Sequence, residues 1–307
     1  MNISVIICTF NRAESLRRTL RTLCEATVPP GVAYEVLVVD NNSTDHTRSV
    51  CEEFCSSLPL RYLFEPRQGK SLALNMAIER ATADLLIFTD DDIDIDPKWL
   101  ESYWRACQRH PDASIFGGRV YPRLPMDTPA WFAAHANDLL RFATGYFDPG
   151  EEEVLGNWTF LGANMALRKS VFRDEEGYRQ EVSIIGNSVR CIRGAEENEI
   201  QNRLRRKGHQ ALYVPSDIVY HRSLHRPSEA YVRATFRSNG INEVRLGEVS
   251  KEHLLFKVPR YYWKQAALHA AKYCLTRWCG PPRIWLKAEI QMAHAWGVIS
   301  ECRRTAD

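Results

Sequence analysis

The sequence lacks the patterns of a disulfide-bonded or membrane-spanning protein. Its nine cysteines are an odd number without any C-x-x-C pair, which argues against a disulfide framework and predicts reduced thiols in a cytosolic protein. No apolar run approaches the roughly 20 residues that a helix needs to cross a bilayer. The apolar stretch at the N-terminus is too short for a signal peptide, and no small-residue cleavage site follows it. We therefore expect a cytoplasmic protein.

Two familiar nucleotide-binding motifs are also missing. There is no G-x-x-x-x-G-K-[ST] P-loop and no G-x-G-x-x-G stretch after the first apolar segment, so ATPases and dinucleotide-binding folds lose most of their support. Internal repeats and low-complexity tracts are absent as well. The net charge is only +2, but residues 251–307 hold ten Lys and Arg against four Asp and Glu. A chain of 307 residues is long enough for one large domain or two modest ones.

The first hundred residues contain a regular alternation of strand and helix patterns. Short apolar runs rich in β-branched residues predict strands at 3–10, 34–40, 60–66 and 85–90. Segments with helical spacing separate them, and Asn11 followed by Glu14 predicts a capping box at the start of the first helix. Strands that are apolar on both faces and alternate with helices predict a parallel sheet covered on both sides. The fold class is therefore α/β.

After residue 97 the pattern loosens. We expect a helix at 97–111, a strand at 113–122, an irregular region at 122–158, a helix at 195–208 that ends at Gly208, and a strand at 210–221. From residue 226 the chain is expected to be helical. In the last helix apolar residues recur at helical spacing, namely Trp285, Ala288, Met292, Trp296 and Ile299. They either pack on the body of the protein or form a basic, Trp-bearing surface that touches anionic lipid.

Five carboxylates in seven positions follow the fourth predicted strand, in "LLIFTDDDIDID": Asp90, Asp91, Asp92, Asp94 and Asp96. Like charges this close repel one another unless a cation lies among them. An EF-hand calcium loop is disfavoured, because Ile95 stands where that loop requires glycine. Asp94 and Asp96 are expected to belong to the turn and the helix start that follow. For the three consecutive acids we predict a divalent-metal site, since hard oxygen ligands suit Mg²⁺ or Mn²⁺.

Polar clusters also follow the earlier predicted strands, at 9–12, 40–44 and 67–70. In a parallel sheet, ligands bind beyond the carboxyl ends of the strands, so we expect these clusters at one edge of the sheet. A metal held by few protein groups completes its coordination with phosphate oxygens of the substrate. The sequence therefore predicts a nucleoside-diphosphate substrate whose leaving charge the metal neutralises.

Six motifs in a fixed order resemble those of family 2 glycosyltransferases with the GT-A fold: "VIICTFNR", "VLVVDNNSTDHT", "GKSLALN", "FTDDDI", "GANMALRKSVF" and "GAEENEIQNRLRRKG". The resemblance implies a Rossmann-like mixed sheet with helices on both faces. It places a catalytic domain at 1–225, with a nucleotide-sugar-binding half at 1–116 and an acceptor half at 117–225, followed by a C-terminal helical region at 226–307.

The resemblance also implies roles for the matching residues. Thr9 and Asp40 would contact the nucleotide base, with Asp40 accepting a hydrogen bond from a pyrimidine. Asp90 and Asp92 resemble the D-x-D element, in which Asp92 would bind the metal directly. Asp90 would contact the ribose or base region, or serve as a further metal ligand. The remaining contacts to the donor that the resemblance implies are Arg12, Lys70 and Asp91.

The acids of "GAEENEI" match a pair that supplies the catalytic base in the family. By that match Glu196 and Glu197 form the pair, and Glu197 would take the proton from the acceptor hydroxyl in an inverting transfer. Acids in a first helical turn can instead complement the helix dipole, which we expect of Glu199. His221 matches a histidine that reaches the metal or the diphosphate, and His225 is a weaker candidate. An ordinary hydrogen-bonding role is the alternative for both histidines.

This chain departs from the family pattern at two places. Many members have an arginine before the asparagine of the third helix, where this chain has Leu74, so Lys70 or Arg67 is expected to supply that cation. The Q-x-x-R-W motif of processive synthases is missing, and so are the membrane spans that usually accompany it. Transfer of a single sugar is therefore expected.

The predicted function is a metal-dependent transfer of one sugar, with inversion, from a UDP-sugar to an acceptor hydroxyl. The metal would be Mn²⁺ or Mg²⁺, and the acceptor a glycan, a lipid-linked sugar or a small molecule in glycan, cell-surface polysaccharide or glycoconjugate biosynthesis. Residues 117–165 and the surroundings of Glu197 would form the acceptor pocket. Three aromatic residues there would stack on sugars or belong to the core: Trp131, Phe132 and Trp158. No nucleic acid is expected as a partner, and the basic C-terminal helices could touch the inner face of the cell membrane.

Two alternatives remain open. A sugar nucleotidyltransferase also uses acids and a metal, but it would show a glycine-rich loop with arginine after the first strand, and "CTFNRAES" contains no glycine. A binding module of the same fold without catalytic activity would keep the nucleotide contacts and lose the base.

Overall fold

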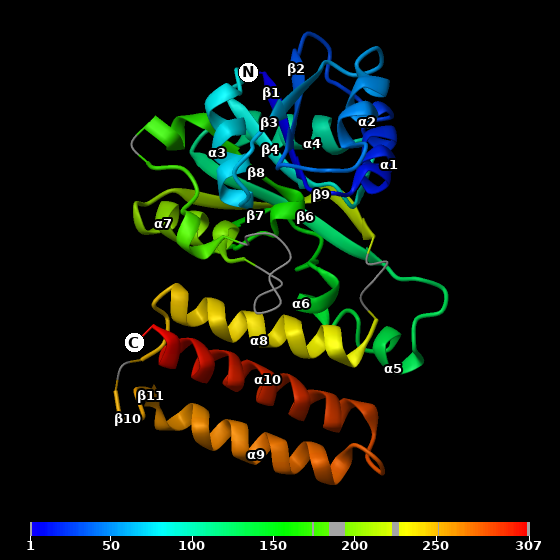
Figure 1. Ribbon diagram of the computed structural model, residues 1–307. Helices are drawn as coiled ribbons and strands as arrows, with labels where there is room; N and C mark the ends of the chain where they lie inside the picture. Colours follow the sequence, from blue (N-terminus) through cyan, green and yellow to red (C-terminus); the bar gives the residue numbers. More distant parts are fainter. Residues whose placement is uncertain (1, 174, 184–193, 223–226, 251, 306–307) are drawn as a thin grey trace. The chain divides into compact units, whose positions relative to one another are not determined.

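The computed structural model describes residues 2–173, 175–183, 194–222, 227–250 and 252–305. They form two compact units, drawn in Figure 1. The described residues of the first unit fall within Met1–Arg123, Phe147–Gly186 and Glu196–Arg222, and those of the second within Leu124–Tyr146, Asn187–Ala195 and Ser223–Asp307. The predicted domains 1–225 and 226–307 remain a prediction, because compactness does not establish which segments act independently.

In the described part of the chain, nine strands form one mixed sheet at the centre of the first unit. Its order is β3-β2-β1-β4-β8-β6-β9-β5, and β7 pairs with β9. The strands are β1 (Ile3–Thr9), β2 (Tyr34–Asp40), β3 (Leu60–Phe64), β4 (Leu85–Asp90), β5 (Ile93–Ile95), β6 (Ala113–Arg123), β7 (Val154–Gly156), β8 (Met165–Arg168) and β9 (Gln210–Arg222). The first four strands are mutually parallel, as predicted, and β8 is antiparallel to both β4 and β6.

Helices cover both faces of this sheet (Figure 1). The helices of this unit with more than one turn are α1 (Ala13–Cys24), α2 (Thr47–Phe54), α3 (Lys70–Arg80), α4 (Trp99–Arg109) and α7 (Glu196–Arg206). Successive residues of a strand point to opposite faces, so Val5 of β1 belongs to one core cluster with α1, while Ile6 belongs to another with α3. Gly208, with φ +89°, follows the end of α7 as predicted.

The predicted capping box at the start of α1 is wrong. Asn11 has φ 50°, and its side-chain oxygen accepts a hydrogen bond from the Thr44 amide at 2.7 Å instead of binding α1. The first amide of the helix, that of Ala13, donates to Asp45 Oδ2 at 3.0 Å. A loop far away in the sequence therefore supplies the acceptor that local spacing had assigned to Asn11.

The second unit consists mainly of three long helices, α8 (Glu229–Arg245), α9 (Arg260–Thr276) and α10 (Pro282–Arg304). The shorter elements are α5 (Ala130–Ala133), α6 (Arg141–Thr144) and a hairpin of β10 (Leu254–Leu255) with β11 (Val258–Pro259). Helix α10 lies between α8 and α9 (Figure 1). A β-carbon at Gly297 would lie 2.1 Å from the Arg237 carbonyl oxygen, so glycine is what allows α10 to approach α8 this closely.

The apolar pattern predicted for the last helix is largely the core of this helical unit. Trp285, Ala288 and Ile299 are buried, whereas Trp296 is exposed. Trp285 packs with α5 and α8 residues in one cluster, and Ile299 packs with Val258 and Ala266 in another. None of the described helices combines the length and the apolar content needed to cross a membrane.

Candidate active site

The carboxyl ends of β2, β1 and β4 lie next to one another in the sheet. Thr9 of β1 is in register with Asp40 of β2, and Cys8 with Asp90 of β4. The polar clusters that follow these strands therefore meet at one edge, as predicted. We call this region of the first unit the carboxylate edge and define it by Thr9, Arg12, Lys70, residues 90–92, Glu197 and His221.

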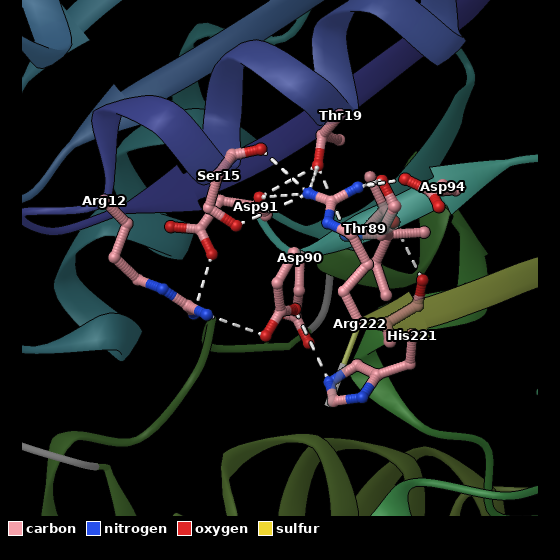
Figure 2. Close-up of polar contacts among 12 residues, drawn as sticks. Arg12, Ser15, Thr19, Thr89, Asp90, Asp91, Asp94, His221 and Arg222 are labelled. Carbon is pink, nitrogen blue, oxygen red and sulfur yellow. Dashed lines mark hydrogen bonds and ion pairs between the residues drawn. The ribbon is translucent and has the colours of Figure 1, made fainter. Parts of the chain in front are cut away.

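Arg12 binds two of the three consecutive acids, and Figure 2 shows it beside Asp91. Its guanidinium lies 2.8 Å from Asp91 Oδ1 and 2.8 Å from Asp92 Oδ2. Thr9 Oγ1 donates a further hydrogen bond to Asp91 Oδ2 at 2.7 Å. Burial raises the pKa of Asp91 to about 7, although the charge of Arg12 opposes this shift. A basic side chain of the protein thus offsets part of the negative charge that we expected a metal to offset.

Asp92 and His221 are close enough to share a ligand. Asp92 Oδ1 lies 3.4 Å from His221 Nε2, and pairing of Ile93 in β5 with His221 in β9 brings the two residues together. A carboxylate oxygen suits Mn²⁺ and an imidazole nitrogen is a common metal ligand, so this donor set fits an ion whose other ligands come from the substrate. Within the described ranges, no group of three or more His, Cys, Asp or Glu is placed to hold a metal ion by itself. His225 lies outside the described residues.

Lys70 connects the first acid of the cluster to the predicted base. Its Nζ lies 3.1 Å from Asp90 Oδ1 and 2.7 Å from Glu197 Oε1. Burial lowers the pKa of Lys70, but the carboxylates of Asp90 and Glu197 outweigh this effect and raise it well above its ordinary value. Arg67, the other predicted cation, is 70 % exposed and binds Glu65 instead. Of the two basic residues, Lys70 is therefore the one that lies at the carboxylate edge.

The two acids at the start of α7 have different surroundings. Glu197 reaches Lys70, and Gly162 leaves room for it, because a β-carbon there would lie 2.3 Å from Glu197 Oε1. Glu196 is only 1 % exposed, and its Oε2 has no hydrogen-bond partner among the described residues. Burial and the neighbouring Glu197 raise the pKa of Glu196 to about 8, while Lys70 opposes the shift. Glu197 is thus the accessible acid of the pair.

The prediction that Asp94 belongs to the turn before the helix is wrong. Asp94 lies in β5, in register with Tyr220 of β9, and its carboxylate binds both Arg123 and Arg222. Figure 2 shows the Arg222 guanidinium among its partners, which are Ser15, Thr19, Asp91 and Asp94. Sequence spacing could not reveal this, because the two arginines come from 29 and 128 residues away.

Asp96 occupies the predicted turn. Its Oδ1 accepts a hydrogen bond from the Lys98 amide at 2.9 Å, just before α4 begins at Trp99. The five acids therefore divide into three groups, with 90–92 at the carboxylate edge, Asp94 in a buried ion-pair cluster, and Asp96 at the helix start.

Asp40, the predicted contact to the nucleotide base, is buried at the end of β2. Its Oδ1 accepts from the Ser43 amide at 2.8 Å, and its Oδ2 accepts from Tyr62 Oη at 2.8 Å. These bonds hold the carboxylate in one orientation and leave it further lone pairs, since an ionised carboxylate can accept about four hydrogen bonds. Tyr62 was missed in the sequence because β3 shows no pattern that separates a site residue from a core residue.

The aromatic residues predicted near the acceptor are divided between the two units. Phe132 is 0 % exposed in the core of the second unit, so of its two predicted roles the structure supports the core one. Trp131 packs against Trp285 in the same unit, with ring centroids 5.4 Å apart. Trp158 belongs to the first unit, where its ring centroid lies 5.6 Å from that of Tyr213.

Besides Tyr62, sequence reasoning missed Arg222, Thr19 and Gly162. Arg222 follows His221 directly, but a lone arginine at a strand end is usually solvated and gives no signal. Thr19 lies among the core positions of an amphipathic helix. Gly162 stands within the quoted motif "GANMALRKSVF", where its position before Ala163 could have indicated a close approach of the backbone to another group.

Comparisons with known proteins bear on the family and the fold of the chain. Residues 4–175 match the family described as glycosyl transferase family 2. The glucosyl-dolichyl phosphate glucuronosyltransferase of Haloferax volcanii is 28% identical over 181 residues, which are 58% of this chain and 56% of that protein. The chain therefore spans about half the length, or less, of curated relatives that it matches.

Solved structures resemble the fold over nearly the whole chain. A Pyrobaculum calidifontis mannosyltransferase, PcManGT, in complex with GDP-Man and Mn²⁺, has a TM-score of 0.62 at 19% identity and covers 97% of this chain and 86% of its own. S. aureus TarS 1-349 in complex with UDP has a TM-score of 0.55 at 17% identity, covering 100% and 92%. These likenesses confirm the predicted GT-A fold. The match over residues 4–175 shows that the chain belongs to glycosyl transferase family 2.

Proposed function

We propose that this protein transfers one sugar, with inversion, from a UDP-sugar to an acceptor hydroxyl, and that it does so in the cytoplasm during glycan, polysaccharide or glycoconjugate biosynthesis. The observation that carries the proposal is the bridge from Asp90 through Lys70 to Glu197, with contacts of 3.1 Å and 2.7 Å. It brings the D-x-D acid and the predicted base to one cation, although Glu197 lies more than a hundred residues further along the sequence. Family membership supports the same reaction class.

The chemistry follows from the position of Glu197. Its carboxylate would take the proton of the acceptor hydroxyl while the hydroxyl oxygen forms a bond to the anomeric carbon. The bond from that carbon to the diphosphate oxygen breaks, and the nucleoside diphosphate leaves with the electron pair. Lys70 would then face the negative charge of the diphosphate as well as that of Glu197. Inversion results because attack and departure occur on opposite sides of the anomeric carbon.

The donor would be held by the remaining members of the carboxylate edge and by Asp40. Thr9 and Asp40 would contact the base, Asp40 through a lone pair that Ser43 and Tyr62 leave unused. Asp92 and His221 would hold Mn²⁺ or Mg²⁺, with Asp90 as a further ligand or as a ribose contact. A bound divalent ion would supply Lewis-acid stabilisation of the departing diphosphate. The Mn²⁺ complex of the related mannosyltransferase fold supports this part of the proposal.

Glu197→Gln tests the proposed base, and Glu199→Gln is its matched control on the same helix. Glutamine keeps the shape and a hydrogen-bonding group but cannot take the proton, so turnover of the Glu197→Gln variant should fall by about 10²- to 10⁴-fold while the affinity for the donor stays within a few fold. Glu199 binds Arg203 at 3.0 Å, so its substitution should leave turnover nearly unchanged. Initial rates of nucleoside-diphosphate release and donor binding by calorimetry measure the two quantities.

Each result has a distinct meaning. Unchanged turnover of the Glu197→Gln variant would remove Glu197 as the base. A wild-type protein that binds the donor and releases no nucleoside diphosphate with any acceptor would favour the binding module. Equal losses in both variants would indicate that charge in the first turn of α7 matters for folding alone.

A further inference from the structure

A long stretch of the second unit carries charge of one sign. Residues 253–288 contain seven Lys and Arg and no Asp or Glu, although the whole chain is nearly balanced with 40 against 38. This stretch includes the hairpin of β10 and β11, the whole of α9, and the start of α10. Neighbouring acids that normally offset basic residues on a helix surface are therefore missing from the segment itself.

Helix α9 presents a continuous exposed stripe. Of its seventeen residues, Ala266 is the one that is fully buried. Tyr261, Leu268 and Leu275 are exposed and seven residues apart, so they lie two turns from one another on the same side of the helix. Lys264 and Lys272 flank this line and are exposed too. We call this stripe, extended by Trp278, the α9 face.

Several large apolar side chains of this region are mostly exposed to solvent. Leu275 is 81% exposed and Trp278 is 86% exposed, just beyond the end of α9. At the other end, Phe256 at the tip of the hairpin is 75% exposed. A helix of this length is about 25 Å long, so an exposed aromatic side chain stands at each end of an apolar line of that length.

The lysines of the α9 face have no acidic partner among the residues that the structure describes. Lys264 and Lys272 make no ion pair there, whereas Arg277 nearby binds Glu229 and Arg283 binds Asp138. The pKa of His269 is lowered by burial and by the charges of Lys272 and Lys287. The arginines beyond the end of α9 are thus paired with acids, whereas the charges of Lys264 and Lys272 on the α9 face are not paired within the described part of the chain.

We propose that the α9 face docks on an anionic lipid surface, with α9 lying along the membrane plane, Leu268 and Leu275 among the headgroups, and Lys264 and Lys272 against lipid phosphates. Exposed apolar residues flanked by lysines, with aromatic residues at both ends, are the pattern of a helix at a membrane interface. A second copy would place like charges opposite each other. Nucleic acid would attract the lysines but offer nothing to the two leucines.

The proposal replaces the residues that the sequence suggested for lipid contact. The pattern around Trp285 in α10 belongs mainly to the core of the unit, and the surface with the matching chemistry is on α9. The proposal does not depend on the glycosyl-transfer reaction, because it concerns elements that lie entirely in the second unit.

Vesicle flotation of the full chain tests the proposal. The probes are vesicles of phosphatidylcholine alone and vesicles of phosphatidylcholine mixed with phosphatidylglycerol. The wild-type protein should float with the mixed vesicles, stay behind with phosphatidylcholine, and be released as the salt concentration rises. Each ammonium group near an anionic surface strengthens binding about fivefold, so Lys264→Glu with Lys272→Glu should weaken it by at least about 25-fold.

A matched variant separates the α9 face from net charge. Arg18 and Arg21 are exposed residues of α1 in the first unit, and Arg18→Glu with Arg21→Glu makes the same change in total charge. This control should float as the wild type does, and circular dichroism should show both double variants folded. Leu268→Ser with Leu275→Ser should weaken flotation by about tenfold through loss of apolar burial.

Several outcomes would overturn the proposal. It fails if the wild type does not float with anionic vesicles, if both charge variants lose flotation equally, or if binding to phosphatidylcholine is as strong. It also fails if light scattering shows a dimer that the Leu268→Ser, Leu275→Ser variant dissociates while vesicles have no effect, or if the α9 lysines bind a DNA oligonucleotide and not vesicles.

Discussion

The carboxylate edge and the α9 face both concentrate charge of one sign, but they differ in how that charge is paired. At the edge, Asp91 and Asp92 bind Arg12, while Asp90 and Glu197 share Lys70. On α9, Lys264 and Lys272 have no acidic partner among the described residues. Pairing inside a fold fixes the position of a charge, whereas an exposed and unpaired charge is available to a partner outside the molecule.

The difference predicts opposite responses to substitution. Removing one member of a buried ion pair leaves its partner charged and desolvated, which costs several kcal/mol. Changing an exposed, unpaired charge costs the fold little. Substitutions in the first region should therefore be seen in stability or turnover, and those in the second only in association with a surface.

The largest effect on stability is expected for Arg222→Met, which adjoins the carboxylate edge because its guanidinium donates a hydrogen bond to the Asp91 carbonyl oxygen. Arg222 is buried, and it binds Asp94 together with the Ile93 carbonyl oxygen at 2.8 Å and Thr19 Oγ1 at 2.9 Å. Without it, the free energy of unfolding should fall by about 3 kcal/mol, since Asp94 would lose the more deeply buried of its two arginine partners. Urea unfolding followed by circular dichroism measures the change. Lys264→Glu, measured in the same way, should stay within about 0.5 kcal/mol of the wild type, and equal losses would abolish the contrast between the regions.

A smaller effect, on turnover rather than stability, is expected for Lys70→Gln. The variant loses the ammonium group that lies between Asp90 and Glu197, so transfer should slow by about 100-fold. Arg67→Gln is the matched control three residues earlier, because Arg67 is exposed and binds Glu65; its transfer rate should change by less than about twofold. A larger loss in the Arg67 variant than in the Lys70 variant would reverse the assignment of the cation.

The narrowest effect expected, confined to the pH dependence of stability, is that of Glu196→Gln. The pKa of Glu196 in the folded protein is about 8, above its ordinary value of 4.5, so the folded protein keeps a proton that the unfolded chain loses between these values. Stability of the wild type should therefore decline as the pH rises through that window. Glutamine does not titrate, so the stability of the variant relative to that of the wild type should increase as the pH rises from about 5 to about 8. Thermal unfolding of both proteins across this pH range measures the difference. Unfolding temperatures that change equally with pH in the two proteins would contradict the account.

The sequence predicted the parallel half of the sheet well, because the residues within each strand were enough to identify it. The strands β1, β2 and β4 are apolar on both faces, and their ends coincide with Thr9, Asp40 and Asp90, so each strand carries its own signal. Because these strands are parallel neighbours, their carboxyl ends lie at the same edge of the sheet, so no knowledge of distant contacts was needed to group them. Glu197 and Lys70 were accessible by another route, the family resemblance, because each stands in a short motif at the start of a helix that matches the family.

Features that depend on distant partners could not be predicted. The position of Asp94 close to Pro97 in the sequence predicts a turn, yet pairing of β5 with β9 places Asp94 beside Arg222. Asn11 was assigned to a helix cap, yet Asp45 provides the acceptor. The ion pairs that Arg12 and Arg222 form with the acid cluster were likewise beyond the reach of spacing, which explains why a metal alone was first expected to balance the charge.

The most direct test of the central claim is a thermal-shift screen of the wild-type protein with nucleoside diphosphates and nucleotide-sugars in the presence of Mn²⁺. We expect UDP and a UDP-sugar to raise the unfolding temperature by several degrees, as a ligand at about 100 times its dissociation constant stabilises the folded state by about 2.7 kcal/mol. The stabilising sugar nucleotide should also be hydrolysed slowly. If no nucleoside diphosphate shifts the transition while the metal is present, the carboxylate edge is not a donor site.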